Sequence, residues 1–301
     1  MDRDSTEYRF DLASVPTTII ETNEKDGKQL KIQDGLVEFK DVCFAYTAER
    51  QILKSLSLKF APGQITAVVG GSGAGKTTTV DLLLKLYEAQ TGQILIDGQQ
   101  LNELNASSVR ACIGMVAADG AIFRGTLASN LRYRKPDATD EELTAAIEQA
   151  GLGNLVARLP QGVNTPIGQS GMGLSVGERQ RLQIGRVLLS RPKILVLDEA
   201  TANLDYNTEA EIKQAIQSLR GRCTIIIIAH RYSMVRDADQ VYVLSDGEVI
   251  ESGTPDALIN SGGWFADFAS SVAEDNQTIE ADDGTEETEV DAEADDESLD
   301  D

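Results

Sequence analysis

The sequence predicts an α/β fold with a largely parallel sheet, and three observations lead to that prediction. Short apolar runs typical of buried strands alternate with stretches in which apolar residues recur at helical spacing. One of these strands runs through a glycine-rich loop into a helix. The chain has 301 residues, of which 41% are hydrophobic, so it can bury one large core or two smaller ones.

The first part of the chain is predicted to be an arm followed by a small antiparallel β subdomain. Residues 1–35 are polar and weakly patterned, which is typical of a linker or arm. Beyond them, apolar and polar residues alternate over 37–39 and 56–60, as they do in half-buried strands. Residues 65–69 form a continuous apolar run that indicates a buried strand, and a helical stretch follows over 76–87.

The rest of the chain is predicted to add a helical subdomain and to complete the sheet. Residues 119–172 are expected to be mainly helical, because Thr139 and Glu142 form a capping box ahead of apolar residues at helical spacing. A further helix is expected over 212–219. The remaining predicted strands are apolar runs next to turn or charge signals, at residues 94–96, 194–197, 224–229 and 241–244.

The charge of the chain is concentrated at its C-terminus. The formal net charge is −22, but residues 273–301 hold fifteen Asp or Glu and no Lys or Arg, which leaves −7 for the remainder. Such a segment is expected to be a disordered acidic tail. The balance argues against nucleic-acid binding, which needs Lys and Arg. No apolar run is long enough to span a membrane, and the three widely spaced cysteines are predicted to be small buried side chains rather than zinc ligands.

A phosphate-binding loop is predicted at residues 70–77, where the sequence Gly-Gly-Ser-Gly-Ala-Gly-Lys-Thr follows a strand and opens a helix. Its glycines allow backbone N–H groups to turn toward a phosphate, and the helix N-terminus adds positive potential. Lys76 is expected to reach the β- and γ-phosphates, and the Thr77 hydroxyl to bind Mg²⁺. The pattern predicts a site for a nucleoside triphosphate.

Two carboxylates, Asp198 and Glu199, directly follow the predicted strand 194–197. Ligands of parallel sheets gather at the carboxyl ends of the strands. We therefore expect Asp198 to face Mg²⁺ and Glu199 to act as general base toward an attacking water. Taken alone, two acids could equally well cap a strand end. Beside a phosphate loop they favour hydrolysis.

Residues 174–181, Leu-Ser-Val-Gly-Glu-Arg-Gln-Arg, resemble the LSGGQ signature of ATP-binding-cassette (ABC) ATPases. The phosphate loop, signature, acidic strand and His230 occur in the order of that family, and the resemblance covers about residues 36–269. It implies a P-loop NTPase (RecA-like) core within an ATPase domain at 36–272. It also implies nucleotide-binding roles for Tyr46, Gly70, Gly71, Ser72, Gly73, Ala74, Gly75, Lys76, Thr77, Thr78, Ser175, Gly177 and Asp205.

The resemblance implies particular roles for these positions. Tyr46 would stack on adenine, although an aromatic on a strand is also an ordinary core residue. Ser175 and Gly177 would bind the γ-phosphate of a nucleotide held by the opposite subunit, with Ser175 capping the following helix. Asp205 would lie at the dimer interface. His230, the single histidine of the chain, would contact the γ-phosphate and would act with Glu199 and Lys76 in catalysis.

Further segments resemble the exporter branch of the family, namely residues 122–131, residues 165–171 and, weakly, residues 5–15. The chain departs from the family pattern at several positions. Ala117 and Ala118 stand where the family has Pro-Gln, and that glutamine would bind Mg²⁺ and report nucleotide state to a membrane domain. Val176 replaces a signature glycine, Glu178 a glutamine, and Gln169 a glutamate.

Three functional readings follow. In the first, the chain is the ATPase domain of an exporter: it binds ATP and Mg²⁺, pairs head to tail with a second copy, and docks on a transmembrane domain or permease at the cytoplasmic side of the membrane. In the second, it is a degenerate ATP-binding clamp that hydrolyses little, because Ala118 replaces the glutamine. The third is a soluble ABC ATPase of DNA repair or translation. The absence of a long coiled-coil insertion or tandem cassette argues against it.

Overall fold

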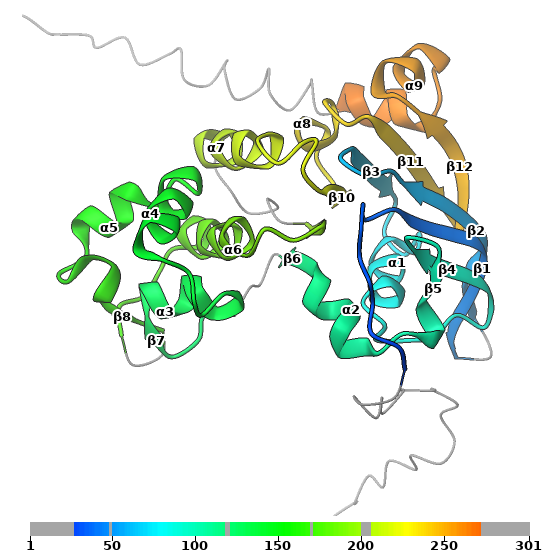
Figure 1. The fold of residues 1–301 in the computed structure, drawn as a ribbon. Coiled ribbons are helices and arrows are strands. Elements are labelled where there is room, and N and C mark those ends of the chain that lie inside the picture. Colours follow the sequence, from blue (N-terminus) through cyan, green and yellow to red (C-terminus); the bar gives the residue numbers. More distant parts are fainter. Residues whose placement is uncertain (1–26, 48–49, 118–120, 169–170, 200–205, 272–301) are drawn as a thin grey trace, which may run out of the picture.

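A computed structural model describes residues 27–47, 50–117, 121–168, 171–199 and 206–271. The described chain forms a six-stranded sheet, a four-stranded sheet and a group of helices beside the larger sheet (Figure 1). The predicted tail, the first 26 residues, and the positions Ala118, Gln169 and Asp205 lie outside the described residues.

The six-stranded sheet has the order β12-β11-β3-β10-β9-β6, and all its neighbouring strands are parallel except the edge pair β11–β12. Its strands are β3 (Ile65–Gly70), β6 (Ile113–Ala117), β9 (Ile194–Asp198), β10 (Thr224–Ile228), β11 (Gln240–Ser245) and β12 (Glu248–Gly253). Every residue of β3 and β10 is buried, as continuous apolar runs require when both faces of a parallel sheet are covered. The predicted parallel α/β sheet is confirmed.

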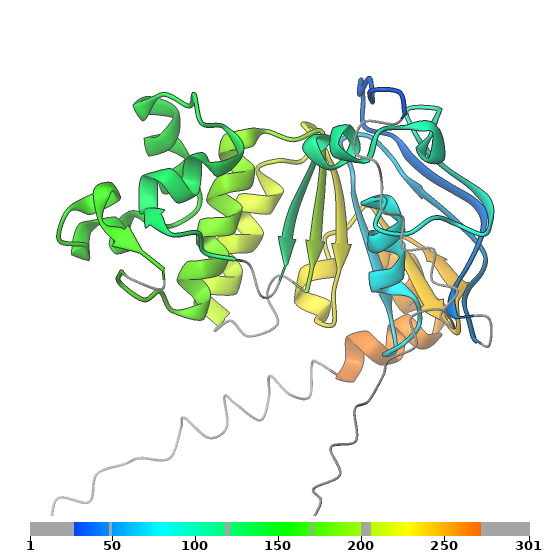
Figure 2. The same ribbon diagram turned by 90° about the horizontal axis from the view of Figure 1, so that it is seen from below.

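Alternate residues of the central strands feed two hydrophobic clusters, one on each face. Ile225 and Ile227 join a cluster with the helices α6 (Val176–Ser190) and α7 (Tyr206–Gln217), whereas Ile226 and Ile228 join a cluster with the small sheet. Figure 2 shows the central strands between these two layers.

The four-stranded sheet is antiparallel, with the order β2-β1-β4-β5, and it confirms the predicted antiparallel β subdomain. Its strands are β1 (Val37–Thr47), β2 (Arg50–Phe60), β4 (Thr91–Ile96) and β5 (Gln99–Gln100). The Asp97 carboxylate, in the turn between β4 and β5, accepts hydrogen bonds from the backbone N–H groups of Gln33, Gly35 and Leu36 at 2.7–3.1 Å. The described end of the predicted arm is thus held against this turn.

Short helices connect the small sheet to the core. These are α1 (Lys76–Leu83), η2 (Leu101–Glu103) and α2 (Ala106–Cys112). Val80, Leu82 and Leu83 of α1 pack in the cluster between the two sheets. The cysteines are less buried than predicted: Cys223 is buried, but Cys43 and Cys112 are half-buried. Cys43 points away from the buried face of β1 that Val42 and Phe44 share, and Cys112 is the last residue of α2.

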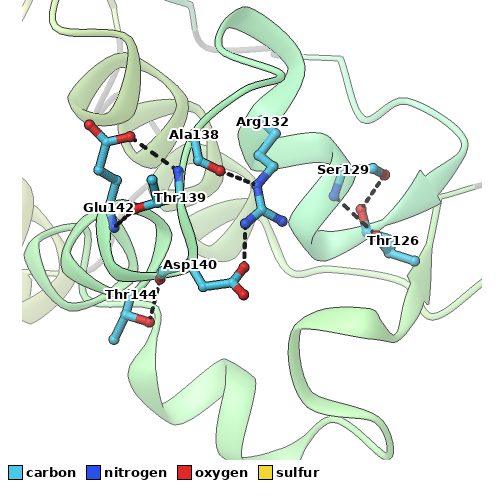
Figure 3. Close-up of polar contacts among 8 residues, drawn as sticks. All are labelled: Thr126, Ser129, Arg132, Ala138, Thr139, Asp140, Glu142 and Thr144. Atoms are coloured by element: carbon cyan, nitrogen blue, oxygen red, sulfur yellow. Dashed lines mark hydrogen bonds and ion pairs between the residues drawn. The ribbon is translucent and has the colours of Figure 1, made fainter.

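The helical part comprises α3 (Leu127–Leu131), η3 (Arg132–Arg134), α4 (Asp140–Gln149), α5 (Gly153–Arg158) and η4 (Gly162–Asn164), with a small hairpin of β7 (Gly125–Thr126) and β8 (Pro166–Ile167). The predicted capping box is present, since Thr139 Oγ1 accepts from Glu142 N at 3.2 Å and Thr139 N donates to Glu142 Oε2 at 3.2 Å (Figure 3). Arg132 bonds both Ala138 O and Asp140, which fixes the approach to α4.

The last part of the described chain holds the short helices α8 (Tyr232–Val235) and α9 (Pro255–Ser261), and residues 264–271 are helical as well. In the part of the chain that the structure describes, none of the helices has both the length and the apolar character needed to cross a membrane.

Candidate functional site

The glycine-rich loop connects β3 to α1 through backbone conformations that favour glycine. Gly70, Gly73 and Gly75 have φ angles of 145°, 77° and 104°. A Cβ at Gly70 would lie 2.1 Å from Leu244 O, and one at Gly75 would lie 2.5 Å from Leu53 Cδ2. No side chain caps the start of α1, so the first backbone N–H groups of that helix are left to an external acceptor. The loop has the geometry of a phosphate site.

Lys76, the first residue of α1, is buried and turns back into the loop. Its Nζ donates to Gly70 O and Gly71 O, both at 2.9 Å. Burial lowers the pKa of Lys76, and the negative charges of Glu199 and Asp198 act against that shift. The ammonium group therefore lies inside the loop, close to the two carboxylates that the sequence singled out.

Asp198 and Glu199 lie where β9 ends. Ile228 on β10 is the register partner of Asp198, so His230 follows at the same sheet edge. Glu199 Oε1 and His230 Nε2 are 2.7 Å apart, and both side chains are about half exposed. Glu199 has a φ of 50°, and its N–H donates to Ile228 O at 3.0 Å. The left-handed backbone costs energy, and here it accompanies a carboxylate aimed at the histidine.

Asp198 has an unpartnered oxygen. Its Oδ1 is buried and has no hydrogen-bond partner among the described residues. Burial, with Glu199 and Asp81 nearby, raises the pKa of Asp198. A buried carboxylate oxygen and the exposed hydroxyl of Thr77 are hard oxygen donors of the kind that Mg²⁺ prefers. These two side chains fit a magnesium ion beside the loop.

A cavity of about 260 Å³ brings most of the predicted residues together. Its lining consists of Tyr46, Arg50, Ile52, Ser72, Gly73, Gly75, Lys76, Thr77, Thr78, Glu199 and His230. Asp198 does not line the cavity, but it lies close enough to Lys76 and His230 for their charges to act on its pKa. Gly70, Gly71 and Ala74 belong to the loop but are likewise outside the lining. The cavity thus brings Lys76, Glu199 and His230 together, whereas Asp198 lies outside its lining.

Arg50 and Ile52 line the cavity but were missed by sequence reasoning. Both lie on β2, which pairs antiparallel with the strand of Tyr46. A guanidinium nitrogen of Arg50 lies 3.9 Å from the position of a Cβ built on Gly73. The available signal was the hairpin itself, because the residues opposite Tyr46 must border the same space.

Tyr46 makes polar contacts on the cavity wall. Its hydroxyl donates to Asp81 Oδ2 at 2.9 Å and lies 3.1 Å from Thr78 Oγ1. Burial and the neighbouring Asp81 raise the pKa of Tyr46 to about 12. The ring packs edge-to-face on Phe44 and Tyr87, at centroid distances of 4.9 and 5.0 Å. The position suits stacking on a flat ligand, and that role stays a prediction.

The signature residues lie elsewhere, at the start of α6. Ser175 caps this helix as predicted: its Oγ accepts from Glu178 N at 3.2 Å, and its N–H donates to Glu178 Oε2 at 2.8 Å. Glu178 is buried and also forms an ion pair with Arg158 of α5. Neither Ser175 nor Gly177 lines the cavity. The described chain therefore does not unite the signature with the phosphate loop.

Comparisons with known proteins agree with this geometry. The family model described as "ABC transporter" matches residues 53–202. The chain is 42% identical over 252 residues to the "Uncharacterized ABC transporter ATP-binding protein YfiC" of Bacillus subtilis, covering 84% of this chain and 42% of that protein. It is 40% identical over 251 residues to "ATP-binding cassette sub-family B member 6" of Homo sapiens, covering 82% and 30%.

A solved structure is also similar. The "Structure of a bacterial Atm1-family ABC exporter with ATP bound" aligns with a TM-score of 0.78 and 38% identity, over 83% of this chain and 44% of that one. This chain thus spans less than half the length of these relatives.

Proposed function

The chain belongs to the exporter-type ATP-binding domains of the ABC transporter family, and from that premise we propose that it hydrolyses ATP to power export through a transmembrane portion. The direct reaction is ATP and water to ADP and phosphate. The observation that carries the proposal is the 2.7 Å contact between Glu199 and His230 on the wall of the cavity that also holds Lys76.

Each residue of the cavity has a role in the proposed reaction. Lys76 binds the β- and γ-phosphates and offsets their charge. Glu199 accepts the proton of the attacking water, and His230 orients Glu199 and contacts the γ-phosphate. Thr77 and Asp198 would hold Mg²⁺, which when bound neutralises phosphate charge. Tyr46 stacks on adenine, with Thr78 and the loop backbone around the phosphates.

The second half of the site is proposed to come from another copy of the chain. Ser175 and Gly177 lie outside the cavity, so a head-to-tail partner would bring its own α6 N-terminus to the γ-phosphate. Asp205, outside the described residues, is proposed for the same interface. The relatives are longer proteins, among them a "Beta-(1-->2)glucan export ATP-binding/permease protein NdvA", and we propose that this domain works beside a permease, on the cytoplasmic side of a membrane.

Steady-state turnover of Mg-ATP by the chain tests the proposal. We expect Glu199→Gln to lower kcat by about 10²–10⁴-fold, the usual contribution of a general base, while ATP binding persists. Glu148→Gln, an exposed glutamate on α4, is the matched control and should leave kcat unchanged. Tight Mg-ATP binding without turnover in the unaltered chain would instead support the degenerate clamp.

A further inference from the structure

Gln183, in the middle of α6, bonds both backbone groups of Ala117, the last residue of β6 at the edge of the six-stranded sheet. Its Oε1 accepts from Ala117 N at 3.2 Å, and its Nε2 donates to Ala117 O at 3.1 Å. Gln183 is buried. One side-chain amide therefore satisfies both hydrogen-bonding groups of Ala117, 66 residues away in the chain.

Ala117 is next to the predicted magnesium ligand. On the adjacent strand β9, its register partner is Asp198, whose Oδ1 is buried without a described hydrogen-bond partner. Gln183 thus fastens α6 to the strand pair that carries Asp198. The same helix is capped at its start by Ser175. Helix α6 therefore connects the signature residues to the sheet edge where Asp198 lies.

Arg186, three residues farther along α6, makes a second attachment on the same helix face. Its guanidinium donates to Ala121 O at 2.7 Å and to Asn130 O and Oδ1 at 2.8 and 2.7 Å. Ala117 and Ala121 are the described residues that flank 118–120. Both sides of that segment are therefore bound to α6, by an amide on one side and by a guanidinium on the other.

We propose that Gln183 is a positioning residue that transmits the orientation of α6 to the magnesium-binding edge of the sheet. It contacts neither nucleotide nor metal, and it acts through the backbone of Ala117. Position 118 is an alanine and offers no side-chain amide of its own. The inference rests on the proposed function, because it concerns the ion that Asp198 and Thr77 would hold.

Gln183→Met, which keeps the length of the side chain and removes its amide, tests the inference. Hydrogen exchange measured on the peptide containing Ala117 should become about tenfold faster, as expected for the loss of a buried hydrogen bond. The Mg²⁺ concentration for half-maximal binding of a fluorescent ATP analogue should rise by about three- to tenfold, while binding without Mg²⁺ stays the same.

Gln180→Met is the matched control. Gln180 lies on the same helix, is fully buried, and neither of its amide atoms has a hydrogen-bond partner among the described residues. Its replacement should change neither readout. Equal effects of the two substitutions would overturn the inference, since they would report helix packing and not the amide.

Two further outcomes keep the inference separable from the proposed function. If the unaltered chain shows no Mg²⁺-dependent nucleotide binding, both fail. If it does and Gln183→Met matches it, only the positioning role fails. Should Gln183→Met not fold, Gln183→Glu retains the acceptor for Ala117 N–H and should give intermediate exchange. Exchange and Mg²⁺ dependence like those of the unaltered chain would then contradict the inference.

Discussion

The cavity at the carboxyl edge of the central sheet and the N-terminus of α6 handle their polar groups in opposite ways. At the cavity, Asp198 keeps a buried oxygen without a described partner, and Glu199 holds a left-handed backbone. At α6, Ser175 and Glu178 cap the helix reciprocally, and Arg158 pairs with the remaining carboxylate oxygen. The cavity thus leaves a buried polar atom without a described partner, whereas the polar groups at the α6 terminus satisfy one another.

The largest effect is expected at Lys76, because the cavity should bind nucleotide without the α6 terminus of a partner chain. We expect Lys76→Ala to weaken nucleotide binding by about 100-fold or more, since it removes charge-assisted hydrogen bonds to phosphate. Calorimetric titration with ATP measures this, and Lys193→Ala, an exposed lysine after α6, serves as control. Affinity within a few-fold of the unaltered chain would show that the loop is not the main binding element.

Much of the cavity half could be predicted because its signals are local. A strand, eight loop residues and a helix are contiguous in sequence, and the acid pair and His230 each directly follow an apolar run. The parallel order of strands then brings those ends to one edge. The fold could be predicted for the same reason, because strands that alternate with helices along the chain can be arranged in only a few ways.

What sequence reasoning missed depends on long-range side-chain contacts. Tyr46 with Asp81, Arg158 with Glu178 and Gln183 with Ala117 are 35, 20 and 66 residues apart. Nothing in residue type or spacing selects those partners, because the final packing of the helices decides them. The prediction that Cys43 is buried was wrong for a similar reason. Buried and exposed side chains alternate along its strand, and the register of the sheet decides which face is covered.

The second-largest effect is expected at Arg158, whose loss would leave Glu178 buried and unpaired. We predict that Arg158→Gln lowers the free energy of unfolding by about 2 kcal/mol, measured by urea denaturation. Glu178→Gln in the same chain should recover most of that loss, since no charge is then stranded. If the two substitutions lowered the free energy of unfolding additively, Arg158 and Glu178 would not stabilise the α6 terminus as a pair.

Ser175→Ala tests the α6 terminus separately from the nucleotide cavity. Loss of the N-cap should cost about 1 kcal/mol of stability and should weaken ATP-driven association of two Glu199→Gln chains, measured by analytical ultracentrifugation. ATP binding to the single chain should be unchanged. Thr139→Ala is the matched control, because it removes an equivalent cap from α4. It should cost similar stability and leave association intact, and equal association defects would argue against the role of Ser175 at a partner's nucleotide.

The smallest effect is expected at Asp198, whose buried carboxylate should lower the stability of the chain when no ion is bound. Burial raises the pKa of Asp198, so the folded chain binds its proton more readily than the unfolded chain. Stability from this group therefore falls as the pH rises from the ordinary aspartate value, near 4, through the raised pKa. Asp198→Asn should then increase the free energy of unfolding at pH 7 by about 1 kcal/mol, and the gain should shrink on acidification toward pH 4. Exposed Asp137→Asn should show neither effect. In saturating Mg-ATP at pH 7 the unaltered chain should become more stable than the Asp198→Asn chain, because only the carboxylate binds the ion. An equal increase in the free energy of unfolding of both chains on adding Mg-ATP would show that Asp198 does not bind the metal.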